Sequence, residues 1–115
     1  MNRLFLSAVA VFSLFSSCAY ADFQAGLRAY DNKDYFTASR EWIPLANAGN
    51  AEAQLYLGLL YHNGLGVERN YQEAMNWYGK SAQQGNIDAQ RNLGVMNYLG
   101  LGMPKNYPQA FKWFS

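Results

Sequence analysis

The stretch GNAEAQLYLGLLYHNGLGVERNYQEAMNWYG, residues 49–79, returns 36 residues later as GNIDAQRNLGVMNYLGLGMPKNYPQAFKWFS, residues 85–115. The two copies share 13 identical residues in 31 positions, where about two would be expected by chance in a chain of mixed composition. The identities in the first copy are Gly49, Asn50, Ala53, Gln54, Leu57, Gly58, Gly64, Leu65, Gly66, Asn70, Tyr71, Ala74 and Trp77. A repeat of this period indicates stacked units of supersecondary structure.

Each copy has the pattern of a helix, a turn and a second helix. Residues 51–63 carry apolar residues at helical spacing and follow Asn50, a favoured N-cap. The glycines of residues 64–66 end this helix, and Asn70 begins the next one, with Glu73 at the position of a capping box. We therefore expect an all-α fold: an α-solenoid of stacked antiparallel helix-turn-helix repeats, with about five helices after an N-terminal signal peptide.

A shorter copy precedes these two. Its Gly26, Asp34, Tyr35, Ala38 and Trp42 correspond to Gly58, Asn70, Tyr71, Ala74 and Tyr78. The glycine and the tyrosine are 9 residues apart instead of 13, because the four residues of the Gly-x-Gly loop are missing. A repeat that loses its loop and keeps both flanks is a pair of helices with a surface connection. The predicted repeat domain, residues 22–115, comprises units at about 22–49, 50–85 and 86–115, the last one incomplete.

Small residues recur where the two helices of a unit would cross. Gly58 and Ala74 of one copy return as Gly94 and Ala110 in the next. A larger side chain at Gly58 is expected to overpack this crossing. We expect the bulky residues late in each second helix to fill the space toward the next unit: Trp42, Tyr78 and Phe114.

The first 21 residues have the features of an export signal. Arg3 is followed by 18 residues without charge, which end in the small-x-small pattern of residues 19–21 that a signal peptidase reads. We expect cleavage before Asp22 and a periplasmic or secreted protein. One alternative is an uncleaved membrane helix, disfavoured because the segment contains four serines where a spanning helix is strongly apolar. The other is a lipoprotein anchored at Cys18.

Composition excludes several classes of function for the chain that remains. It has 94 residues, eight basic and eight acidic side chains, no cysteine, and His62 as its one histidine. A neutral chain without a basic run lacks the charge that nucleic acids and anionic membranes select. We therefore expect no nucleic-acid partner and no membrane insertion after signal cleavage. Without thiols or clustered histidines, we also expect no catalytic residue, no cofactor and no metal.

The first full copy carries the motif Ala53-Gln54-x-x-Leu57-Gly58-x-x-Tyr61-x-x-Gly64-x-Gly66-Val67-x-x-Asn70-Tyr71-x-x-Ala74-x-x-Trp77-Tyr78-x-Lys80-Ser81-Ala82-x-x-Gly85. It resembles the Sel1-like repeat, a relative of the tetratricopeptide repeat. The second copy has Asn97 and Met103 in place of Tyr61 and Val67, and Gly79 falls inside a helix. The resemblance implies an α-solenoid whose known members are adaptors and scaffolds for protein complexes, including exported ones in bacterial envelopes. A cysteine-rich branch of the family is linked to β-lactam binding and hydrolysis, but this chain lacks its disulfide pairs.

A partner would bind on the concave face of such a stack. The first helix of each unit lines this face, and residues there vary because they do not hold the stack together. Positions 55, 62 and 63 differ in chemistry from 91, 98 and 99, as expected for such residues. The predicted partner-binding residues are Leu55, Leu59, His62, Asn63, Arg91, Val95, Tyr98 and Leu99, with Leu27 and Tyr30 from the leading unit. Together they would form an apolar groove for an extended peptide or a helix; ordinary solenoid surface, or burial under a following unit, is the alternative.

We predict an exported, non-enzymatic bacterial repeat protein that binds a protein or peptide partner as an adaptor or scaffold in the envelope. One alternative is an envelope enzyme related to β-lactam-hydrolysing Sel1-repeat proteins. Another is a non-functional fragment of a longer repeat protein, because the last copy stops at Ser115 without the equivalent of residues 80–85. Trp113 and Phe114 would then be partly uncovered, and we expect residues 22–115 to aggregate or oligomerise.

Overall fold

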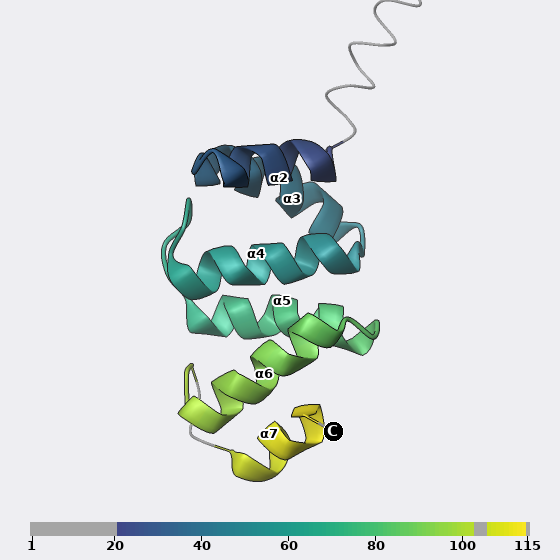
Figure 1. Ribbon diagram of the computed structural model, residues 1–115, viewed down its shortest axis with the longest axis vertical. Coiled ribbons are helices and arrows are strands. Elements are labelled where there is room, and N and C mark those ends of the chain that lie inside the picture. Colours follow the sequence, from purple (N-terminus) through teal and green to yellow (C-terminus); the bar gives the residue numbers. More distant parts are fainter. Residues whose placement is uncertain (1–20, 103–105, 115) are drawn as a thin grey trace, which may run out of the picture.

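The computed structural model describes residues 21–102 and 106–114, and within them it contains six helices and no strand. The helices are α2 (Phe23–Asp31), α3 (Tyr35–Asn47), α4 (Ala51–Asn63), α5 (Tyr71–Gln83), α6 (Ile87–Leu99) and α7 (Tyr107–Phe114). Each packs on its neighbours in sequence, so the helices stack in chain order down the long axis of Figure 1. The predicted all-α solenoid is confirmed. Apart from Ala21, the predicted signal peptide lies outside the described residues.

The described residues contain six helices, where the sequence predicts about five. The last copy forms α7 as its second helix. Asn106 Oδ1 accepts a hydrogen bond from the backbone N–H of Gln109 at 3.0 Å, and Ala110 is buried where α7 packs on α6. A capped N-terminus and a packed small residue therefore both stabilise this helix of eight residues.

Asparagine caps recur at the helix starts, as the repeat predicts. Asn50 Oδ1 accepts from the N–H of Ala53 at 2.8 Å, and Asn86 Oδ1 accepts from the N–H of Ala89 at 2.9 Å. Asn70 caps α5 in the same way, through the N–H of Glu73 at 3.1 Å. The predicted capping box is only half formed there, because the N–H of Asn70 donates to the carbonyl of Tyr61 at 2.9 Å.

The glycine crossings lie where the repeat places them. A Cβ built on Gly58 would lie 2.5 Å from the ring of Tyr78, and one on Gly26 or Gly94 would overlap Trp42 or Phe114. Each ring therefore also packs back onto the glycine of its own unit, a contact that the expected packing toward the next unit did not include. The next unit is contacted as well: the rings of Trp42 and Tyr56 have centroids 4.9 Å apart.

Two hydrophobic clusters run through the stack, one mainly between α2, α3 and α4, the other between α4, α5 and α6. A repeated polar contact joins successive units. Gln54 Nε2 donates to the carbonyl of Ala46 at 3.1 Å, and Gln90 Nε2 donates to that of Ala82 at 3.2 Å. These bonds explain why glutamine recurs at a position that faces a neighbouring helix. None of the helices in the described ranges is long and apolar enough to cross a membrane.

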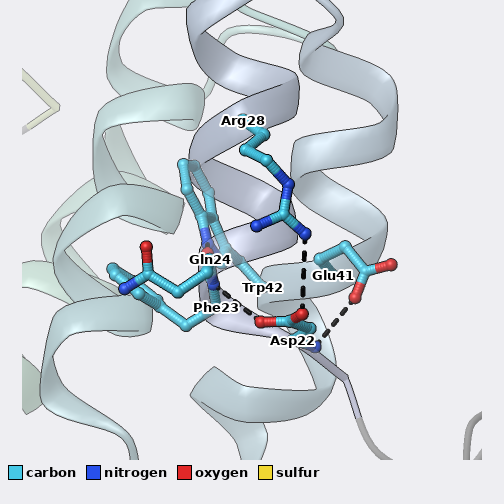
Figure 2. Close-up of polar contacts among 6 residues, drawn as sticks. All are labelled: Asp22, Phe23, Gln24, Arg28, Glu41 and Trp42. Carbon is cyan, nitrogen blue, oxygen red and sulfur yellow. Dashed lines mark hydrogen bonds and ion pairs between the residues drawn. The ribbon is translucent and has the colours of Figure 1, made fainter.

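Polar contacts around Asp22 begin the first helix (Figure 2). Asp22 Oδ1 accepts from the N–H of Gln24 at 2.9 Å, which caps α2. The backbone N–H of Asp22 donates to Glu41 Oε2 on α3 at 2.9 Å, and Arg28 Nη2 lies 3.7 Å from Asp22 Oδ2. The start of α2 is thus tied both to its own helix and to α3.

Candidate protein-binding surface

The predicted residues of α6 lie on one side of that helix. Arg91, Val95, Tyr98 and Leu99 are separated by four, three and one residues, a spacing that gathers them on one helical face. The exposed fractions are 38% for Val95 and 51% for both Tyr98 and Leu99. Arg91 is exposed as well and forms an ion pair with Asp88 at 3.3 Å. The structure therefore brings the four predicted α6 residues together at the surface.

The predicted residues of α4 are much less accessible. Leu59 is half-buried and packs against the second cluster, while Asn63 is exposed and donates through Nδ2 to the carbonyl of Leu59 at 3.1 Å. His62 is half-buried, with its ring edge-on to Tyr71 at 5.5 Å between centroids. Of these predicted α4 residues, only the polar Asn63 is well exposed, so they offer little apolar surface to a partner.

Leu55 was predicted to lie on the binding surface, but the structure buries it. It is 7% exposed and belongs to the second cluster, together with Ala89, Leu93 and Met96 of α6. The first helix of the next unit, α6, covers this position, whereas the equivalent residue of that unit, Arg91, is exposed. Leu27 and Tyr30 of the leading unit are half-buried and pack against the first cluster.

Burial shifts the pKa values of His62 and of the neighbouring Tyr78. Its Nδ1 lies 3.4 Å from the hydroxyl of Tyr78, and desolvation lowers the pKa of the imidazole below 6.5. Burial also raises the pKa of Tyr78 far above its usual value, partly offset by a hydrogen bond with the side chain of Asn92. Within residues 21–102 and 106–114, no three His, Cys, Asp or Glu side chains gather to hold a metal. His62 thus sits in a packing contact between α4 and α5.

Comparison with known proteins identifies the repeat. The sequence profile of the Sel1 repeat family matches residues 51–86 and 87–115. The chain belongs to the Sel1 repeat family. A Sel1 repeat protein from Oxalobacter formigenes has 39% sequence identity and a TM-score of 0.77, over 81% of this chain and 38% of its own. A protective antigen of uropathogenic Escherichia coli that displays an SLR fold has 33% identity and a TM-score of 0.79, over 89% of this chain and 24% of its own.

A relative from Rattus norvegicus, DAP3-binding cell death enhancer 1, is 44% identical over 41 residues. That match covers 36% of this Sel1-repeat chain and 8% of the rat protein. The chain thus spans less than half the length of each of these relatives. The comparisons show a Sel1-repeat protein of bacterial type, a scaffold of stacked helices in which they identify no enzymatic domain.

Sequence reasoning missed one residue of this Sel1-repeat surface. Ile87 is 68% exposed and lies one turn before Arg91 on the same side of α6. It also borders a hollow of about 290 Å³, with Gln90, Arg91, Trp113 and Phe114. A comparison of the two copies could have found this residue, because Ile87 is large and apolar where the preceding copy has Ala51. We name the exposed side of this helix the α6 face: Ile87, Arg91, Val95, Tyr98 and Leu99.

Proposed function

We propose that this chain binds another protein through the α6 face and acts as an adaptor or scaffold, without catalysing a reaction. The observation that carries the proposal is the exposure of four large apolar side chains, Ile87, Val95, Tyr98 and Leu99, on one side of one helix. Contiguous exposed apolar surface marks interaction sites in soluble proteins. Sel1 and tetratricopeptide-like repeats typically bind proteins, which agrees with this use of the surface.

The shape and charge of the α6 face suit a helix or an extended segment. Its apolar residues span α6 from the first turn to the last, so a partner segment of similar length would be contacted along its whole apolar side. Arg91 lies within the stripe, and its ion pair with Asp88 is exposed at both side chains. Exposed pairs of this kind contribute little to stability, so Arg91 is available to orient an acidic group of the partner.

A binding test uses protein purified from cells that express the full reading frame, immobilised and incubated with the envelope fraction of its host. Tyr98→Arg places a charge among the apolar residues in the last turn of α6, and we expect bound partner to be lost. Asn76→Arg is the matched control, because Asn76 is an exposed residue of α5 outside the α6 face. Equal retention of the same proteins by both variants would contradict the proposal. Purified protein is expected not to hydrolyse a chromogenic β-lactam.

We further propose that the chain is exported and cleaved before Asp22. Two features support this: the signal-like sequence of residues 1–21, and the position of Asp22 as the N-cap of the first described helix. Cleavage there leaves the cap and its bond to Glu41 within the mature protein. Intact-mass analysis of protein from the host tests it. A mature chain that starts at Asp22 is expected; a lipidated chain that starts at Cys18, or an uncleaved chain, would contradict it.

A further inference from the structure

A hollow of about 320 Å³ lies among α5, α6 and α7. It is lined by Met75, Gly79, Leu93, Asn97, Asn106, Gln109 and Trp113. The lining is mainly apolar, apart from the side-chain amides. A cavity of about 150 Å³ with apolar walls is large enough to bind benzene. The hollow therefore has room for one aromatic ring.

The repeat shows how this hollow arises. Asn97 stands where the preceding unit has Tyr61, and Gly79 stands where the leading unit has Ile43, by the alignment of Tyr78 with Trp42. Both changes replace a large side chain with a small one. Tyr61 is half-buried and packs against the first cluster, whereas a Cβ built on Gly79 would meet nothing within 4 Å. Tyr61 thus fills in the earlier unit a place that Asn97 leaves open in the later one, and Gly79 adds no side chain beside it.

Asn97 supplies a polar group at the hollow. The residue is 2% exposed, and its Nδ2 donates to the carbonyl of Leu93 at 3.0 Å. Its Oδ1 is buried and has no hydrogen-bond partner among the residues that the structure describes. Buried acceptors are nearly always paired, because an unpaired one loses the hydrogen bonds it would make with water. Asn97 lines the hollow, so a rotation of its side chain that turns Oδ1 toward the hollow would provide an acceptor for a ligand that brings a donor.

We propose that this hollow binds a tyrosine side chain of a partner polypeptide, with the ring against Leu93 and Trp113 and the hydroxyl donating to Asn97 Oδ1. The ring takes the place that Tyr61 has in the preceding unit. Asn97 lies two residues from both Val95 and Leu99, so it is on a different side of α6 from the α6 face. The tyrosine site and the α6 face are thus separate surfaces.

The test is an NMR titration of isotope-labelled protein, purified from cells that express the full reading frame, with N-acetyl-tyrosine amide. We expect saturable shifts at the backbone amide of Gly79 and the side-chain amide of Asn97, with dissociation in the millimolar range. N-acetyl-phenylalanine amide lacks the hydroxyl and is expected to bind about tenfold more weakly, the effect of one hydrogen bond to a buried acceptor.

Matched variants separate filling of the hollow from general damage. Gly79→Ile restores the larger side chain of the earlier unit and is expected to abolish the shifts. Gly79→Ala replaces the same helical glycine but adds only one methyl group, and this variant is expected to keep the ligand-induced shifts. Asn97→Leu is expected to reduce binding of the tyrosine amide to the level of the phenylalanine amide. The proposal is overturned if the tyrosine amide gives no saturable shift at Gly79 and Asn97, if both amides bind equally, or if Gly79→Ile binds as the wild type does.

Discussion

The central hairpin, α4–α5, and the last hairpin, α6–α7, are built on the same sequence pattern but differ in burial. In both, a glycine of the first helix contacts an aromatic ring of the second, Gly58 with Tyr78 and Gly94 with Phe114. Tyr78 is 0% exposed, whereas Phe114 is 49% exposed. The repeat therefore determines the contact within a unit, and the neighbouring unit determines how far that contact is removed from water.

The same difference explains where binding residues lie. Leu55 in the central hairpin is buried by α6, while its counterpart Arg91 is exposed. Ile87 is exposed where the central hairpin has the small Ala51. Position 55 is thus core in the central hairpin, whereas its counterpart 91 is at the surface of the last described hairpin.

The largest expected difference in stability is between removal of the Tyr78 ring and removal of the Phe114 ring. Tyr78→Ala removes a fully buried side chain and is expected to lower the free energy of unfolding by about 4 kcal/mol. Phe114→Ala removes a half-exposed ring and is expected to cost about 2 kcal/mol, because less apolar surface leaves the core. Urea unfolding monitored by circular dichroism measures both. Equal losses would show that burial does not distinguish the two hairpins.

Overpacking the two crossings is expected to give the next largest effect. Gly58→Val drives a side chain into the ring of Tyr78, which is enclosed on all sides, and is expected to cost about 3 kcal/mol. Gly94→Val meets Phe114, a half-exposed ring that can move outward, so about 1 kcal/mol is expected. Thermal unfolding of the two variants compares them. A larger loss at Gly94 than at Gly58 would refute this order.

The helix caps should not distinguish the hairpins. Asn50 and Asn86 make the same bond, at 2.8 and 2.9 Å. We expect Asn50→Ala and Asn86→Ala each to cost about 1 kcal/mol, as measured by urea unfolding. Losses that differ as strongly as those at the two rings would mean that the whole last hairpin is weakly folded, and not only its outer surface.

The smallest expected effect depends on pH and is confined to the central hairpin. Burial lowers the pKa of His62 below 6.5, so the unfolded chain takes up the proton first as the pH falls. The contribution of neutral His62 is fully present above pH 6.5 and decreases as the pH drops through 6.5 toward the folded pKa. The urea midpoint of His62→Gln should therefore fall less than that of the wild type over this window. The exposed neighbour Asn63→Gln serves as control, and parallel pH profiles for all three proteins would contradict the assignment.

The fold could be predicted from the sequence because each copy of the repeat makes the same contacts within its own unit. The spacing of Gly58, Ala74 and Tyr78 is a local property of one unit, and the asparagine caps are local as well. Burial across units was harder to predict. Leu55 was expected at the surface, since its chemistry differs from that of Arg91. The difference arises because α6 covers Leu55, whereas Arg91 lies on the exposed side of α6.

The two proposed sites show the same limit. Ile87, Asn97 and Gly79 are visible in the sequence as departures between copies. Whether such a departure exposes a side chain, leaves a hollow or is absorbed by repacking depends on the three-dimensional neighbours. The unpaired oxygen of Asn97 is a property of geometry that no spacing rule contains.

Photocrosslinking in the living host tests the central claim, that the α6 face contacts a protein partner. A benzophenone amino acid in place of Tyr98, an exposed residue of the stripe in the last turn of α6, is expected to give a discrete higher-mass adduct after irradiation. The same amino acid in place of Asn76, exposed on α5, is expected to give none. An adduct from position 76 together with none from position 98 would contradict the account.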